Sequence, residues 1–241
     1  MNYAHRGFSG KYPENTMLAY RKAIEAGCDG IELDVQFSKD HELVLIHDEK
    51  IDRTCCHKGY VKDYTYEQLS AFDFSYKFKF RVPFQKIPTL REYFELVKNL
   101  DIITNIELKT SIIEYPGIEQ AVYDLICEYN LQKKVVISSF NHYSILRMKA
   151  LDPHLVCGFL TESCLIAPGS YVSMQKVEGY HPRYTSLSKE VVQEVHEHGI
   201  RINTWTPNGK EDIQKVLDLG VDGIITNYPD RVRQCMEGKS I

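Results

Sequence analysis

The 241-residue chain has no long apolar run, no run of basic residues and no Cys-x-x-Cys pair. A membrane-spanning helix needs about 18 or more consecutive apolar residues, so stable membrane insertion is not expected. A net charge of −4 without a basic run argues against nucleic acid and anionic membranes as partners. The seven cysteines are an odd number without zinc-ligand spacing, which indicates reduced thiols and not a disulfide framework.

Several catalytic and nucleotide-binding motifs are also missing. The sequence contains no Gly-x-Ser-x-Gly elbow, no Walker loop, no His-Glu-x-x-His pair and no dinucleotide glycine fingerprint. The N-terminus shows no charged-then-apolar leader, so the chain as written is expected to be cytoplasmic.

Short apolar runs alternate with stretches of helical periodicity along the chain. The expected strands are Asn2–His5, Gly30–Phe37, Leu43–His47, Ile102–Leu108, Val135–Ser138, Val156–Leu160, Arg201–Thr206 and Gly223–Thr226. The expected helices are Thr16–Ala26, Leu90–Asn99, Ile118–Tyr129, Ser144–Ala150, Lys189–His198, Lys210–Leu219 and Asp230–Met236. Strands that alternate with helices form a parallel sheet, and about eight such units fit a closed (β/α)₈ barrel. We therefore expect one barrel domain spanning residues 1–241.

Residues 48–87 interrupt this alternation. They separate a strand from the next helix by far more than the two to six residues of an ordinary βα loop. The segment is rich in aromatic residues, and residues 72–80 alternate apolar and polar side chains with a period of two. We expect an insertion that packs a small core of its own, or alternatively one that lines the site as an apolar wall.

Three carboxylates occur where buried strands end. Glu32 and Asp34 are two residues apart in an apolar strand, so both side chains point to one face. Glu107 stands at the end of another strand. Buried carboxylates that face one another need a cation, a shared proton or hydrogen-bond donors. Three of them predict a site for Mg²⁺ or Ca²⁺, which prefer oxygen ligands.

Two histidines and two basic residues accompany the carboxylates. His5 and His47 close apolar runs, and imidazole can act as an acid or a base at neutral pH. Arg6 and Lys109 provide positive charge for an anionic substrate. A hard cation, two histidines and basic side chains at the mouth of a barrel together indicate phosphate-ester chemistry.

A set of motifs in fixed order extends this interpretation. They are His5-Arg6-Gly7, Pro13-Glu14-Asn15-Thr16, Gly30-Ile31-Glu32-Leu33-Asp34-Val35, His47-Asp48, Asp52-Arg53-Thr54, Ile87-Pro88-Thr89-Leu90, Glu107-Leu108-Lys109, Asn203-Thr204-Trp205-Thr206 and Gly220-Val221-Asp222-Gly223-Ile224-Ile225-Thr226-Asn227. With these motifs the chain resembles the glycerophosphodiester phosphodiesterase family over essentially its whole length. Cys55 and Pro207 depart from the usual pattern, and both lie outside the expected catalytic residues.

The resemblance implies a TIM barrel with a small insertion after the second strand, and hydrolysis of glycerophosphodiesters to an alcohol and sn-glycerol 3-phosphate. Glycerophosphocholine and glycerophosphoethanolamine are examples of such small-molecule substrates. By the same resemblance His5 and His47 form the acid/base pair, and Glu32, Asp34 and Glu107 hold one divalent cation. Arg6 and Lys109 bind phosphate oxygens, and Trp205 lines the substrate pocket.

Two other functions stay open at this point. One is lysophospholipase D activity on the same machinery, with an acyl chain resting on the aromatic insertion. The other is a non-catalytic barrel that binds phosphodiesters, although binding alone does not require two titrating histidines. The sequence leaves the preferred alcohol, Mg²⁺ versus Ca²⁺, the acid/base assignment of the histidines and the oligomeric state open.

Overall fold

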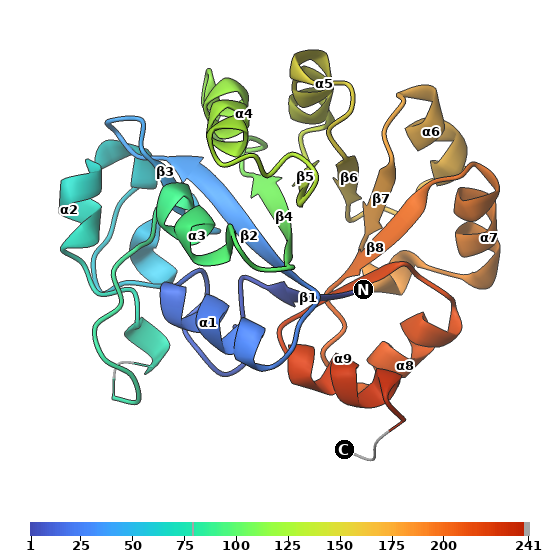
Figure 1. Ribbon diagram of the computed structural model, residues 1–241, viewed down its shortest axis with the longest axis horizontal. Coiled ribbons are helices and arrows are strands. Elements are labelled where there is room, and N and C mark those ends of the chain that lie inside the picture. Colours follow the sequence, from blue (N-terminus) through green and yellow to red (C-terminus); the bar gives the residue numbers. More distant parts are fainter. Residues whose placement is uncertain (79, 239–241) are drawn as a thin grey trace.

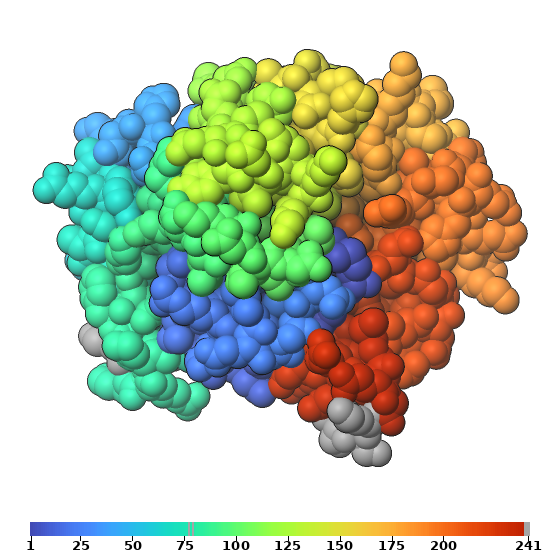
Figure 2. Space-filling model, viewed as in Figure 1, coloured from blue at the N-terminus to red at the C-terminus, as the bar shows by residue number. Residues whose placement is uncertain are grey.

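Eight parallel strands form a closed barrel. The computed structural model describes residues 1–78 and 80–238. The barrel strands are β1 (Asn2–His5), β2 (Gly30–Phe37), β4 (Ile103–Leu108), β5 (Val135–Ser139), β6 (Cys157–Thr161), β7 (Gly179–Pro182), β8 (Arg201–Trp205) and β9 (Gly223–Thr226). Strand β1 pairs with β2 on one side and with β9 on the other, which closes the barrel. The first and last segments of the chain therefore lie side by side, as the blue and red regions of Figure 2 show.

Helices surround the strands (Figure 1). They are α1 (Met17–Glu25), α3 (Leu90–Val97), α4 (Ile118–Glu128), α5 (His142–Leu151), α6 (Pro168–Met174), α7 (Lys189–Glu197), α8 (Lys210–Asp218) and α9 (Pro229–Met236). Polar N-caps begin several of them: the hydroxyl of Thr16 accepts a hydrogen bond from the Ala19 amide, and Thr89 forms a capping box with Glu92. None of the helices in the described residues combines the length and the apolar character that crossing a membrane requires.

The predicted (β/α)₈ barrel is confirmed, but one expected strand needs correction and one barrel strand was not expected. Leu43–His47 was expected to join the parallel sheet; instead β3 (Leu43–Leu45) runs antiparallel to β2 and stands outside the barrel. The barrel strand that was not expected is β7, because Gly-Tyr-His-Pro is not an apolar run. Helix α6 was also not expected, since proline, glycine and serine occupy its first turn.

The alternation along β2 explains how charged residues come to lie in a buried strand. All eight of its residues are buried. Ile31, Leu33 and Val35 belong to the main hydrophobic core. Glu32 shares its strand face with Asp34 and, unlike the three apolar residues, borders a cavity at the mouth of the barrel.

The segment between β3 and α3 packs around a second apolar cluster. It contains helix α2 (Tyr66–Ser70) and three short 3₁₀ segments. The buried core of this cluster consists of Val44 from β3 and, from the segment itself, Ile46, Ile51, Cys55, Val61, Leu69, Phe74 and Ile87. The period of two over residues 72–80 does not produce a strand, because the described residues form turns and the 3₁₀ segment Tyr76–Phe78. Position 79 lies outside the described residues.

Candidate active site

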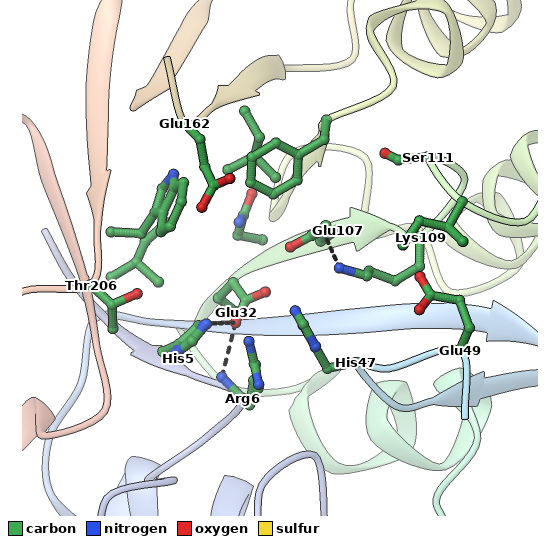
Figure 3. Close-up of a pocket in the computed structure, with 16 residues that line it drawn as sticks. His5, Arg6, Glu32, His47, Glu49, Glu107, Lys109, Ser111, Glu162 and Thr206 are labelled. Atoms are coloured by element: carbon green, nitrogen blue, oxygen red, sulfur yellow. Dashed lines mark hydrogen bonds and ion pairs between the residues drawn. The ribbon is translucent and has the colours of Figure 1, made fainter. Parts of the chain in front are cut away.

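A cavity opens where the carboxyl ends of the barrel strands meet. Its volume is about 380 Å³, within the range typical of small-molecule sites. Figure 3 shows the side chains that border it. It brings together most of the residues expected from the sequence, namely His5, Arg6, Glu32, His47, Glu107, Lys109 and Trp205. Asp34 lies just below the cavity surface and is fully buried.

The three predicted metal ligands converge. One carboxylate oxygen from each of Glu32, Asp34 and Glu107 lies within 4.8 Å of the others. Parallel pairing of β2 with β4 produces this arrangement, because Asp34 is in register with Glu107. All three side chains are buried. Three oxygen donors without nitrogen or sulfur suit Mg²⁺ or Ca²⁺ better than zinc.

The electrostatics of the carboxylates also fit a cation. Burial, together with the charges of Asp34 and Glu107, raises the pKa of Glu32 well above its ordinary value. Burial also raises the pKa of Glu107, although Lys109 opposes this effect. The Oδ1 atom of Asp34 is buried and has no hydrogen-bond partner among the described residues. A divalent cation would relieve both the repulsion and this unsatisfied oxygen.

The loop after β1 contributes backbone as well as side-chain groups. The Arg6 amide donates to Oε2 of Glu32 at 2.9 Å, with Arg6 itself at φ +56°. Its guanidinium reaches Glu14 at 2.9 Å and Asp34 at 3.4 Å. Gly7 follows at φ +76°, where an added Cβ would lie 2.7 Å from the backbone of Ala19. The turn therefore fixes Arg6 between two carboxylates of the site.

A polar layer under the cavity holds the ligands in place. Asn15 donates through Nδ2 to Oδ2 of Asp34 at 2.8 Å and accepts at Oδ1 from the Tyr20 hydroxyl. Glu14 pairs with Arg6 and with Arg53, whose Nη1 lies 2.5 Å from Oε2 of Glu14. The residues of the Pro-Glu-Asn-Thr motif thus support the site in addition to starting α1.

His5 is held in one orientation by Asn227. Its Nδ1 lies 2.6 Å from Oδ1 of Asn227, and because that oxygen can only accept, Nδ1 carries the proton. Nε2 then has a free lone pair and lies 3.9 Å from Oε2 of Glu32. Burial, reinforced by Arg6, lowers the pKa of His5 to about 3. His5 is thus presented to the cavity as a neutral imidazole.

His47 is oriented by a carboxylate instead. Its Nδ1 lies 2.6 Å from Oδ1 of Asp48, and Asp48 also accepts from Nε of Arg53 at 2.6 Å. Gln36, at the end of β2, directs Nε2 toward the carbonyl oxygen of His47 at 3.1 Å. His47 therefore is not part of a barrel strand. It lies just after β3, and the hydrogen bond from Gln36 attaches its backbone to β2. The two histidines face the cavity with different supporting groups.

Lys109 extends over the acidic cluster from the end of β4. Its Nζ lies 2.8 Å from Oε1 of Glu107 and 4.0 Å from Oδ1 of Asp34. Nearby Glu107 and Asp34 outweigh burial, so the pKa of Lys109 is raised and the amine stays charged. Arg6 and Lys109 thus border the cavity as cations beside the carboxylates.

The opposite side of the cavity contains residues that were not expected from the sequence. Phe140 follows β5, Leu160 is in β6, and Glu162 follows β6; with the expected Trp205 they form this wall. No catalytic motif marks Phe140 or Glu162, and their position after strands β5 and β6 is the signal that could have identified them. Of the residues 48–87, Glu49 lines the cavity, whereas the aromatic side chains do not.

His181 belongs to the barrel interior and does not line this cavity. It is fully buried on β7, its Nε2 accepts from Nδ2 of Asn203 at 3.1 Å, and burial lowers its pKa to about 3. Its carbonyl oxygen accepts from Nε1 of Trp205 at 2.9 Å. His181 thus supports the wall of the cavity through its backbone.

Comparisons with known proteins agree with this geometry. Residues 5–231 match the model of the Glycerophosphoryl diester phosphodiesterase family. Relatives named glycerophosphodiester phosphodiesterase, from Caldanaerobacter subterraneus subsp. tengcongensis and from Bacillus altitudinis, are each 44% identical to this chain. The first alignment covers 94% of this chain and 93% of the relative, and the second covers 98% and 97%.

A solved structure is similar over nearly the whole fold. It is an Oleispira antarctica phosphodiesterase in complex with the product sn-glycerol-3-phosphate. The TM-score is 0.87 at 25% identity, with 98% of this chain and 96% of the other covered. The chain belongs to the glycerophosphoryl diester phosphodiesterase family, a family of hydrolases.

Proposed function

We propose that the protein hydrolyses glycerophosphodiesters, such as glycerophosphocholine or glycerophosphoethanolamine, to an alcohol and sn-glycerol 3-phosphate with the help of a divalent cation. One observation carries this proposal: two histidines and the basic side chains of Arg6 and Lys109 border the cavity at which a carboxylate triad converges. Binding a phosphodiester would not require two oriented imidazoles, so the arrangement favours catalysis over a binding role.

Glu32, Asp34 and Glu107 would hold the cation. When bound there, Mg²⁺ or Ca²⁺ supplies positive charge that stabilises the negative charge developing on phosphate oxygens. Arg6 and Lys109 would add to that charge and orient the phosphate, because both side chains border the cavity beside the triad.

His5 and His47 would perform the proton transfers. One takes the proton from the attacking hydroxyl, and the other donates a proton to the departing alkoxide, each contributing about 10²–10⁴-fold. Their fixed Nδ1 partners, Asn227 and Asp48, leave Nε2 of each ring for the substrate. The attacking group is water, or it is the glycerol 2-hydroxyl, which gives a cyclic phosphate that water then opens to glycerol 3-phosphate. Trapping of the cyclic species in slow variants distinguishes the two routes.

The test measures release of glycerol 3-phosphate from glycerophosphocholine with Mg²⁺, with Ca²⁺ and with EDTA, for the wild type and His5→Ala. We expect release that depends on the metal and is lost in the variant. No release with either ion from any diester would contradict the proposal and favour a binding role.

Lysophospholipase D activity is the second candidate, with a changed location for the acyl chain. The expected place was the aromatic insertion, but none of its aromatic side chains lines the cavity: some pack into the insertion's own cluster, and others, such as Phe80, are exposed. An apolar groove instead continues from the cavity past Leu160 and Phe140 to Ile166 and Tyr171. Equal turnover of short and acylated diesters would favour this activity, and no turnover of acylated diesters would exclude it.

A further inference from the structure

The two halves of the cavity differ in chemistry. The triad, both histidines and both basic residues come from β1, β2, β4 and the segment after β3. The facing wall is built by Phe140, Glu162 and Trp205, which lie at the carboxyl ends of β5, β6 and β8. Figure 3 shows Glu162 across the cavity from Arg6 and His47, with its carboxylate pointing inward. A substrate whose phosphate lies at the triad would extend one end toward this wall.

Two aromatic rings form a corner in the wall. Nε1 of Trp205 donates to the His181 carbonyl at 2.9 Å, which fixes the indole. The ring of Phe140 lies edge-to-face against it, with centroids 5.6 Å apart and planes at 82°. Both rings line the cavity, and the face of an aromatic ring presents a negative π surface. Such a corner attracts a cation, a quaternary ammonium group above all.

Glu162, an exposed residue that lines the same cavity, adds a carboxylate to this wall. No hydrogen-bond or ion-pair partner contacts its carboxylate in residues 1–78 and 80–238. Across the cavity Glu107 pairs with Lys109, whereas Glu49, like Glu162, has no hydrogen-bond or ion-pair partner at its carboxylate among the described residues. An uncompensated carboxylate beside aromatic faces favours a positively charged group over a neutral or anionic one.

We propose that Phe140, Glu162 and Trp205 form a subsite for a positively charged alcohol portion of the diester, an amino alcohol or its quaternary ammonium derivative. This inference rests on the proposed function and adds the substrate class that the site prefers. The groove beyond Phe140 would admit an alkyl chain as well, but an alkyl chain there would lie against the Glu162 carboxylate and desolvate it. The carboxylate therefore argues for a cation at this position.

The test compares Glu162→Gln with the wild type on three diesters: glycerophosphocholine, glycerophosphoethanolamine and glycerophosphoglycerol, whose alcohol is neutral. We expect kcat/KM to fall about fivefold for the two cationic substrates, mainly through KM, and to stay unchanged for the neutral one. Phe140→Leu keeps an apolar side chain without a π face. It should therefore lower kcat/KM selectively for glycerophosphocholine, by about threefold.

Glu49→Gln is the matched control. Glu49 also lines the cavity, on the side of Lys109, so the variant removes the same charge from the other half (Figure 3). It should not change the ratio of kcat/KM between cationic and neutral substrates. If Glu162→Gln lowers kcat/KM equally for all three substrates, Glu162 contacts the glycerol phosphate portion that they share, and the inference is wrong. If it raises turnover of acylated diesters instead, the wall takes an alkyl chain.

Choline alone gives a readout that does not depend on turnover. It should raise the melting temperature of the wild type and of Glu49→Gln, but not that of Glu162→Gln. If the wild type hydrolyses no diester but still binds choline through Glu162, the proposed function fails and the subsite stands. If choline has the same effect on all three proteins, the subsite is excluded whatever the reaction.

Discussion

The Nδ2 atom of Asn15 donates a hydrogen bond of 2.8 Å to Oδ2 of Asp34, and both side chains are buried. Asn15 has φ +51°, a conformation that asparagine and glycine tolerate better than most residues. The Tyr20 hydroxyl donates to the other end of the amide at 2.9 Å. The amide is therefore fixed at both ends and directs the Asp34 carboxylate toward the other two carboxylates.

Asn15→Gly should weaken binding of the divalent cation by about 10- to 100-fold, as loss of an outer-sphere hydrogen bond typically does. Glycine keeps the positive φ, so the change removes the donor without straining the turn. Calorimetric titration with Mg²⁺ and Ca²⁺ measures the effect. Tyr20→Phe removes only the hydroxyl that orients the amide, so it should weaken cation binding less than Asn15→Gly does. An unchanged affinity in Asn15→Gly would mean that Asp34 needs no such support.

Metal binding should stabilise the fold. At a concentration 100 times the dissociation constant, the cation adds about 2.7 kcal/mol to the free energy of unfolding. For a chain of this size that corresponds to a rise in melting temperature of about 5–10 °C. Scanning calorimetry with Mg²⁺ or Ca²⁺ and with EDTA measures the shift. No shift with either ion would argue against a metal site at the triad.

Glu32→Gln separates two effects of the carboxylate cluster: the destabilisation of the metal-free fold by its buried charge, and the binding of the cation. Burial and two neighbouring carboxylates raise the pKa of Glu32, so its charge is unfavourable without a cation. Glutamine can still accept from the Arg6 amide. In EDTA the variant should therefore melt at or above the wild-type temperature, while its shift with metal should disappear. Glu211→Gln, at the exposed start of α8, should keep the full shift.

The sequence predicted which side chains converge at the cavity more completely than it predicted the strands. Glu32, Asp34 and Glu107 were identifiable because carboxylates in apolar strands conflict with burial, and parallel register then brings them together. Strand β7 was not predictable in this way, since Gly179 and Pro182 do not produce an apolar run and pairing with its neighbours determines it. Strand β3 has the apolar run that was expected of a barrel strand, but it lies outside the barrel: Leu43 and Leu45 pack into the main core and Val44 packs into the cluster of the insertion.

The supporting residues were less visible than the ligands. Asn15 was identified from the sequence as part of a motif and not as a supporting residue; in the structure Thr16 is the N-cap of α1, and Asn15 holds Asp34. Glu162 and Phe140 follow strands without any motif around them, so only the closed barrel brings them to the cavity. Contacts between elements far apart in sequence determine these positions, and the local periodicity of the sequence does not predict such contacts.

Replacing either histidine should remove turnover without removing the metal. His5→Ala and His47→Ala are each expected to lower kcat about 10²- to 10⁴-fold, because each removes one proton transfer. The metal-induced shift in melting temperature should persist in both variants, since neither ring belongs to the triad. His154→Ala, at an exposed position, serves as the control. Loss of the shift in His5→Ala would assign that imidazole to the metal.

Arg53 links the supporting carboxylates and should make stability depend on pH. Its guanidinium contacts Glu14 at 2.5 Å and Asp48 at 2.6 Å. Burial alone would raise the pKa of both carboxyls. For Glu14, the hydrogen bonds and charges of Arg53 and Arg6 outweigh burial and lower the pKa; for Asp48, those of His47 and Arg53 do so. A lowered folded-state pKa stabilises the fold above the unfolded-state value of about 4, and this contribution is lost as the pH falls through the folded-state values.

Arg53→Met should therefore destabilise the protein by about 1–2 kcal/mol at neutral pH, with some discount for the partial exposure of the pair. Urea unfolding at a series of pH values should show a constant difference from the wild type between pH 8 and about pH 5, and a shrinking one below about pH 4. Arg91→Met, which breaks the pair with Glu128 between half-exposed side chains, should have a much smaller effect. A difference for Arg53→Met that does not change with pH would mean that packing of the arginine stem, and not its charge, stabilises this region.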